Sequence, residues 1–135
     1  MKIILKCVLG AVCLAAFMPV AWAGEQVTAV RDTDGVQRVT MTVDSHFYKP
    51  DHLVVLAGVP VELILISRTT FTPHNFVLKE PNAGMDINKE IGAGETVKVR
   101  FTPTKPGVFT FFCDKKLLFF KSHRDKGMEG ILKVQ

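Results

Sequence analysis

Residues 113–128 read Cys-Asp-Lys-Lys-Leu-Leu-Phe-Phe-Lys-Ser-His-Arg-Asp-Lys-Gly-Met and follow the apolar run Val-Phe-Thr-Phe-Phe of residues 108–112. A short apolar run with aromatic side chains is typical of a β-strand. The stretch after it holds three side chains that bind soft metals, namely the thiol of Cys113, the imidazole of His123 and the thioether of Met128. The segment therefore predicts a strand that leads into a metal-binding loop.

A second imidazole, that of His74, lies 39 residues before the cysteine. Two imidazoles, one thiolate and one thioether form the donor set of a mononuclear copper centre, in which His₂Cys is trigonal and the Met is a long axial ligand. Soft sulfur donors favour Cu(I) and imidazoles suit Cu(II), so that one geometry can hold both oxidation states. We therefore predict one copper ion per chain, with four ligands: His74, Cys113, His123 and Met128.

Each candidate ligand also has an ordinary structural interpretation. Cys113 fits a buried, inert thiol, Met128 fits core packing, and the two histidines fit surface loops. Zinc is the alternative metal, although a thioether is an unusual zinc ligand and copper binds more tightly than zinc in the divalent series. The remaining histidines, His46 and His52, fit exposed loops better than a second metal site.

Alternating apolar and polar residues recur along the chain. In residues 37–43, Val39, Met41 and Val43 share one face, which is the pattern of a half-buried strand. Because no long helical period occurs, we predict an all-β fold, a Greek-key β-sandwich or barrel of about seven to eight strands. The expected strands are residues 37–43, 53–56, 61–67, 75–78, 95–101, 108–113 and 130–134, with irregular connections at 44–51 and 79–94.

The chain resembles the cupredoxins, the type 1 blue-copper proteins. The resemblance rests on Phe-Phe-Cys at the end of an apolar run, on the pattern Cys-x9-His-x4-Met-x-Gly and on a single histidine before it, and residues 47–58 and 94–113 look like framework segments of the family. It implies that residues 36–135 form a cupredoxin-like domain that acts as a one-electron carrier. It also implies that Asn75, which follows the first ligand, supports the cysteine loop by a hydrogen bond.

The nine residues between the cysteine and the second histidine depart from the small electron carriers of that family, in which this spacer is shorter. The spacing is closer to the type 1 centre of copper nitrite reductases. The insert contains Leu-Leu-Phe-Phe at residues 117–120, and two interpretations are open. The insert either folds back and packs on the sandwich, or forms an exposed apolar docking patch with a charged rim. The rim residues are Lys115, Lys116, Lys121 and Arg124.

The first 23 residues resemble a secretory signal peptide. Lys2 and Lys6 precede an apolar stretch at residues 8–20, and Ala-Trp-Ala follows as a cleavage site. The alternative is an uncleaved membrane anchor, but the apolar stretch is short for a membrane span. We expect a periplasmic or secreted protein, in which residues 24–35 form a flexible lead or a short edge strand.

Cleavage would leave 112 residues, which suffice for one domain. One of the three cysteines, Cys113, would remain, so that no internal disulfide is expected. The net charge would fall from +4 to +2, which indicates neither a nucleic-acid partner nor a general membrane surface. We expect a monomer without stable membrane insertion.

Two functions compete on this evidence. The first is an electron carrier whose redox partner, a haem protein or an oxidase, has an acidic docking surface that complements the basic loop. The second is a copper chaperone, buffer or sensor without electron transfer. An enzyme is not expected, because a type 1 centre alone does no substrate chemistry. The sequence also has no His-x-His pair for further copper ions.

Overall fold

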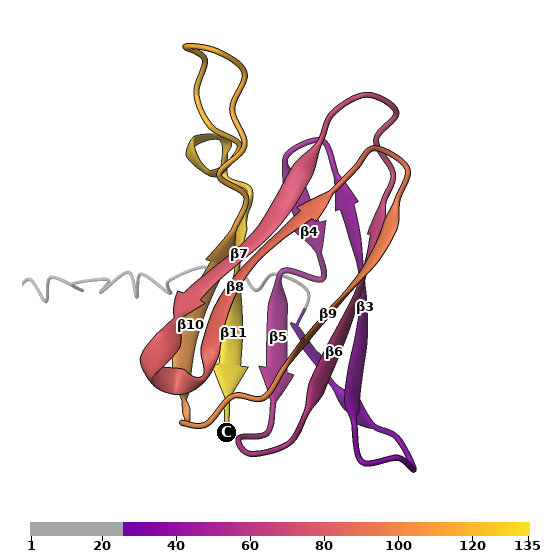
Figure 1. Ribbon diagram of the computed structural model, residues 1–135, viewed down its shortest axis with the longest axis vertical. Helices are drawn as coiled ribbons and strands as arrows, with labels where there is room; N and C mark the ends of the chain where they lie inside the picture. The colour runs from indigo at the N-terminus through magenta and orange to yellow at the C-terminus, as the bar shows by residue number, and fades with distance from the viewer. Residues whose placement is uncertain (1–25) are drawn as a thin grey trace, which may run out of the picture.

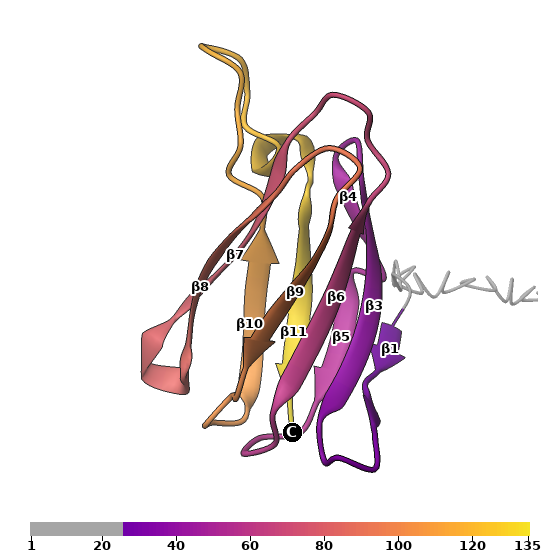
Figure 2. The same ribbon diagram turned by 45° about the vertical axis from the view of Figure 1, so that its right-hand side comes forward.

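The computed structural model describes residues 26–135, which form two β-sheets packed face to face (Figures 1 and 2). The first sheet has the strand order β1 (Gln26–Thr28), β5 (His52–Val55), β11 (Glu129–Val134), β10 (Gly107–Phe112), β7 (His74–Glu80) and β8 (Met85–Ile91). The second has the order β2 (Val30–Arg31), β3 (Gln37–Asp44), β6 (Val61–Ser67) and β9 (Thr96–Phe101), and β4 (Phe47–Lys49) pairs with β3. Two 3₁₀ turns complete the described elements, η1 (Pro81–Ala83) and η2 (Arg124–Lys126). The all-β sandwich is confirmed.

The strand number is eleven among the described residues, above the seven to eight expected. Three segments account for the difference. Residues 79–94 were expected to be irregular, which is wrong, because η1 turns the chain and β8 then pairs along its whole length with β7. Residues 44–51 contain β4, and residues 26–31 form β1 and β2 at the edges of the two sheets, which agrees with a short edge strand, one of the two alternatives expected for this segment. Pairing with neighbours, more than local pattern, makes these segments strands.

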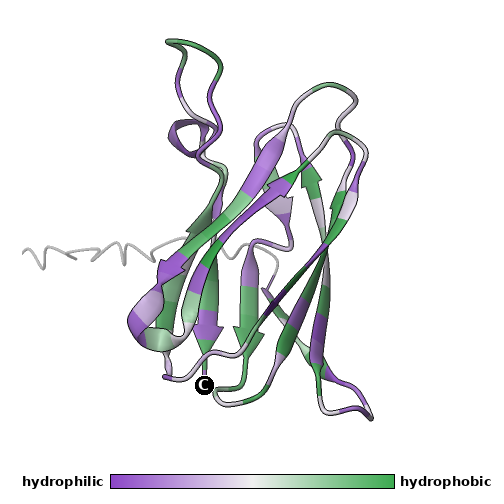
Figure 3. Ribbon diagram, viewed as in Figure 1, coloured by the Kyte–Doolittle hydropathy of each residue, from purple (hydrophilic) through white to green (hydrophobic). Residues whose placement is uncertain are grey.

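The core lies between the sheets and is built from the alternating residues. Val39, Met41 and Val43 of β3 are buried, and parallel pairing with β6 sets them beside Leu63 and Leu65. Figure 3 shows apolar residues alternating with more polar ones along β3. The expected inward faces of the later strands are buried at Val99, Phe101, Phe111, Cys113, Leu132 and Val134, whereas Val97 and Phe109 are half-buried.

Glu62 is the one charged residue of the interior strand β6, and only 2% of it is exposed. The register places Arg38 of β3 and Arg100 of β9 directly on either side of it. Arg100 pairs with it at 2.6 Å, Arg38 at 3.3 Å and Lys98 at 3.4 Å. The hydrogen bond from Arg100 is the main reason that the pKa of Glu62 lies below its usual value. Cross-strand cations therefore satisfy the charge that interrupts the apolar strand.

Three strands converge at the end of the sandwich opposite the C-terminus (Figure 1). β7 begins there at His74, and β10 ends there next to Cys113. β11 begins there directly after Met128, and its Glu129 is opposite Phe112 of β10. All four predicted ligands therefore lie at one end of a rigid scaffold. No helix in residues 26–135 is long and apolar enough to cross a membrane.

Candidate metal centre

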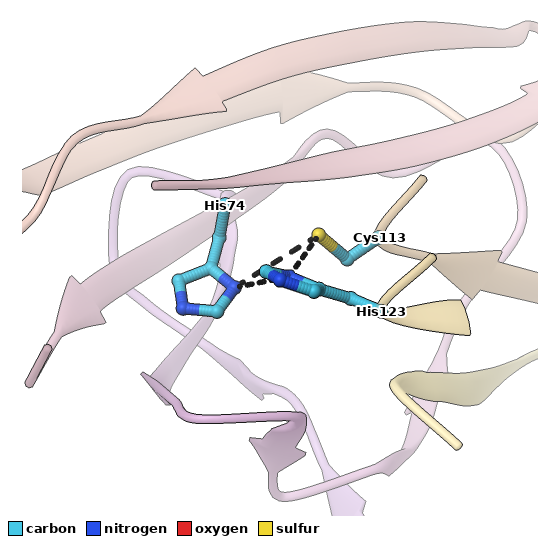
Figure 4. A group of neighbouring side chains, drawn as sticks. All are labelled: His74, Cys113 and His123. Atoms are coloured by element: carbon cyan, nitrogen blue, oxygen red, sulfur yellow. Dashed lines mark hydrogen bonds between the residues drawn. The ribbon is translucent and has the colours of Figure 1, made fainter. Parts of the chain in front are cut away.

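His74, Cys113 and His123 come together in a buried cluster (Figure 4). Nδ1 of His123 lies 3.2 Å from Nδ1 of His74 and 3.4 Å from Sγ of Cys113, and Sγ lies 3.9 Å from Nδ1 of His74. The three donor atoms are close enough to one another to bind the same ion. One thiolate and two imidazoles suit copper, so the residues present fit one copper ion.

His74 is fully buried at the start of β7. Burial, followed by the nearby charge of His123, lowers the pKa of His74 to about 4. The Nε2 atom is buried and has no hydrogen-bond partner among the described residues. The ring is therefore kept neutral at pH 7, which is the form that binds a metal.

Cys113 is also fully buried, and it is the one free cysteine of the described chain. Burial raises the pKa of its thiol, whereas the backbone N–H of Asn75, which donates to Sγ at 3.5 Å, lowers it. A thiolate in this position requires a cation to offset the loss of hydration. A metal ion at the centre of the cluster would supply that charge.

Met128 lies against the cluster through its backbone. The backbone N–H of Cys113 donates to the carbonyl of Met128 at 3.1 Å, and the N–H of Met128 donates to the carbonyl of His123 at 2.9 Å. Between His123 and Met128 the chain reverses direction through the turn η2 and Gly127, whose φ is +93°. The side chain is fully buried. These contacts place Met128 beside two of the donors, and its role as the axial ligand stays a prediction.

Asn75 joins the two ligand-bearing segments, as the resemblance implied. Its side-chain Nδ2 donates to Oδ1 of Asp114 at 2.7 Å, and its Oδ1 accepts from the backbone N–H of Asp114 at 3.1 Å. Nδ2 also donates to Asn88 at 3.0 Å, and the hydroxyl of Tyr48 donates to the Asn75 carbonyl at 2.5 Å. The supporting hydrogen bond is therefore confirmed, with a denser network than was expected.

Two residues beside the cluster were not expected there, since Tyr48 was not considered and His46 was expected in an exposed loop. Tyr48, the one tyrosine of the chain, is buried edge-on against Phe76 and Phe111. His46 lies edge-on to the ring of His123, with centroids 5.0 Å apart, but is not part of the donor cluster. His52 instead pairs with Asp51 at 2.9 Å. Since β4 was read as part of a connection, its contacts gave no signal in the sequence.

The nine-residue insert projects from the sandwich (Figure 1). The interpretation that it folds back and packs on the sheets is wrong, because its four apolar side chains are exposed. The exposed fractions are 69% for Leu117, 72% for Leu118, 88% for Phe119 and 55% for Phe120. The exposed conformation agrees with the second interpretation, and the docking role stays a prediction.

Replacement of Asn75 by Ala is expected to destabilise the protein by about 1–3 kcal/mol, because the buried Asn75 side chain makes three hydrogen bonds to Asp114 and Asn88 that the alanine cannot make. The urea midpoint of the apoprotein measures this. Asn82→Ala, on the exposed turn η1, is the matched control and should leave the midpoint nearly unchanged. Equal midpoints for the two variants would contradict the structural role of Asn75.

The apoprotein is expected to lose stability as the pH falls from 6.5 towards about 4. In this window an unfolded His74 binds a proton that the folded one does not, so protonation favours the unfolded chain. Above pH 6.5 this effect is absent. Urea midpoints at about pH 7 and pH 4.5 should differ less in His74→Gln than in the parent. An unchanged pH dependence in the variant would contradict the lowered pKa.

The comparisons with known proteins agree with this fold. The structure is similar to the metal-binding domain of the Streptococcus pneumoniae D39 Cu(I)-exporting P-type ATPase CopA with Cu(I), at 24% identity and a TM-score of 0.65, covering 84% of this chain and 98% of that one. It is also similar to dithionite-reduced auracyanin from Roseiflexus castenholzii, at 20% identity and 0.57, covering 73% and 96%. Auracyanin A from Chloroflexus aurantiacus, titled a "blue" copper protein, matches at 20% identity and 0.54, covering 73% and 99%.

No curated protein sequence matches the chain. The family profile described as the cupredoxin-like domain matches residues 10–127, a range that holds three of the four predicted ligands and ends one residue before Met128. The match spans well over half of the sequence, and the sandwich and the buried His-Cys-His cluster fit it. The chain belongs to the cupredoxin-like domain family.

Proposed function

We propose that this chain is a periplasmic or secreted copper protein that carries one electron at a time and does no substrate chemistry. In this proposal the copper ligands are His74, Cys113, His123 and Met128. The observation that carries it is the buried triangle of donor atoms, which lie within 3.2–3.9 Å of one another. Bound copper would supply the Cu(I)/Cu(II) couple.

The contribution of the chain itself is to fix the positions of the metal-binding side chains. Two donors are anchored at strand ends, and the third, His123, is anchored by its backbone N–H, which donates to the carbonyl of Lys115 at 2.7 Å. The pair of hydrogen bonds between Asn75 and Asp114 fixes the first segment to the second. A donor set that cannot relax changes little with oxidation state, which favours fast electron transfer.

The route for the electron is proposed to pass through His123. This ring is 8% exposed, and it lines a pocket with Phe71, Pro73 and Leu117. The pocket also contains Lys115 and Lys116. We propose that an acidic surface of a redox partner, a haem protein or an oxidase, docks there.

The rate at which this protein associates with its redox partner should fall severalfold between about 50 and 500 mM salt, because salt screens the attraction between the lysines and the acidic surface. A rate independent of salt would contradict the electrostatic part.

The experiment that tests electron transfer is voltammetry of the copper-loaded protein, together with its electron self-exchange rate measured by NMR line broadening. A reversible one-electron couple with rapid self-exchange is the expected result. A slow, irreversible couple would overturn the proposal even if copper binds tightly.

Copper handling without electron transfer is the second candidate. The observation that favours it is the similarity to the Cu(I)-exporter domain. A chaperone must release its metal, whereas the cluster here is buried. Transfer of copper to a Cu(I) chelator distinguishes the two functions. Transfer within seconds favours the chaperone, and retention over hours favours the electron carrier.

A further inference from the structure

The end of the ligand loop is a protruding apolar tip, defined here as Leu117, Leu118, Phe119 and Phe120. Its side chains are 55–88% exposed although all four are large and apolar. Figures 1 and 2 show the loop reaching beyond every other part of the described chain at this end, and Figure 3 shows its outermost part as apolar above polar legs. Exposed apolar residues grouped in this way mark an interaction surface.

The tip is held as a turn rather than left as an open coil. The backbone N–H of Phe120 donates to the carbonyl of Leu117 at 2.9 Å, and the rings of Phe119 and Phe120 stack with centroids 5.0 Å apart. At its base, Lys115 pairs with Glu90 of β8 at 2.6 Å. The hydrogen bond across the tip satisfies part of its backbone, as an apolar environment demands.

Positive charge surrounds the base of the tip. Lys116 and Lys121 flank the apolar residues on either side and make no ion pair among residues 26–135. Two acids lie nearby: Asp114 accepts a hydrogen bond from Asn75, and Asp125 accepts from the hydroxyl and N–H of Ser122. Those hydrogen bonds from Ser122, and to a smaller extent the charges of Lys121 and Arg124, lower the pKa of Asp125. Long lysine side chains can stay at a polar boundary while their neighbours enter an apolar phase.

The shape of the tip favours a lipid bilayer over a protein as its occupant, whereas the pocket beside His123 is the surface proposed for the redox partner. A specific protein interface buries roughly 800 Å² on each partner, over a broad complementary surface. Figures 1 and 2 show the loop as a narrow projection, and a bilayer accepts such a shape without a matching pocket. Apolar side chains with adjacent lysines suit the boundary between acyl chains and anionic headgroups. Although the net charge of the whole chain gives no such indication, its local distribution does.

We propose that the tip docks reversibly into anionic phospholipid membranes, with Leu118 and Phe119 entering the acyl region and Lys116 and Lys121 contacting lipid phosphates. The neighbouring loop supports this orientation, because Phe71 in it is 90% exposed and lines the same pocket as Leu117. Docking turns the His-Cys-His cluster towards the bilayer, within reach of a partner embedded there. The interaction needs no copper and goes beyond the proposed electron transfer.

The test is sedimentation of residues 24–135 with vesicles of phosphatidylcholine containing about 30% phosphatidylglycerol, compared with phosphatidylcholine alone. This chain contains every described element and omits the apolar leader, which would bind lipid by itself. We expect binding to the anionic vesicles that weakens at high salt. L118S/F119S should reduce partitioning at least tenfold, and K116Q/K121Q roughly tenfold.

Matched controls distinguish binding through the tip from nonspecific binding to vesicles. V30S/V108S removes two apolar side chains that are each 67% exposed elsewhere, and K89Q/K105Q removes two exposed lysines outside the loop. Both should bind like the parent. Trp22, the single tryptophan, lies in the omitted leader, so F119W introduces the only indole. Its emission should shift to the blue and be quenched by brominated lipid, whereas that of V108W should not.

Absence of binding to anionic vesicles, or equal binding by L118S/F119S and the parent, would overturn the proposal. Tip-dependent binding to a redox protein without vesicle binding would also overturn it and assign the tip to protein docking. Since the assay is run on both the apoprotein and the copper-loaded protein, its result is independent of the voltammetry that tests electron transfer.

Discussion

Cys113→Ala is expected to abolish the intense thiolate-to-copper absorption band of the Cu(II) protein. The sulfur is one corner of the donor triangle, and no other cysteine lies in the described chain. Loss of a residue that only hydrogen-bonds to a metal ligand lowers metal affinity roughly 10–100-fold. Loss of the ligand Cys113 itself should lower the copper affinity by more than that. Visible absorption, EPR and competition with a chelator measure these effects.

The fold should survive this substitution, because a small buried side chain is replaced by a methyl group. A urea midpoint close to that of the parent is the control for folding, and His52→Ala is the control for copper, since His52 lies outside the cluster. A weak spectrum that is the same in Cys113→Ala and the parent would mean that the thiolate does not bind copper. The electron-carrier proposal would then fall, while the vesicle experiment would keep its meaning.

Gly130→Ala is expected to have the largest effect on stability. A Cβ atom at this position would overlap both the ring of Phe111 and the carbonyl oxygen of Asp51. The carbonyl belongs to the backbone and accepts a hydrogen bond from Ile131 at 2.7 Å, so it cannot move aside without breaking that contact. We expect a loss of about 3 kcal/mol, the upper part of the range for overpacked cores. Urea unfolding followed by far-UV circular dichroism measures it.

Gly94→Ala is the matched control for the loss of a glycine. A Cβ atom there meets no heavy atom within 4 Å, but φ is +71°, so the left-handed conformation should cost about 1 kcal/mol. A similar loss in both variants would show that crowding at Gly130 is not the cause. Because Met128 lies two residues away, Gly130→Ala should also broaden the copper spectrum, which Gly94→Ala should not do.

The all-β class, most of the interior strands and the candidate donors could be predicted from the sequence. Period-two alternation is a local property, so β3 and β9 were visible without knowledge of their partners. The donors were recognisable because the order His, Cys, His and Met at these spacings resembles the ligand pattern of the cupredoxins. Only the tertiary structure could bring His74 to the other two donors, because strand pairing joins positions 39 and 49 residues apart.

The tertiary structure also decided what local patterns leave open. β8 has only two buried residues, Met85 and Ile91, and is a strand because β7 pairs with it along its length. In the sequence, Glu62 was an unexplained charge in an apolar strand. The tertiary structure explains it by the cations on neighbouring strands that pair with it. The apolar residues 117–120 were compatible with burial and with exposure. Hydrophobicity measures how much a side chain favours leaving water, but it does not tell whether a neighbour is present to cover that side chain. That choice depends on the surface left free by the packed sheets, and here the loop extends away from it.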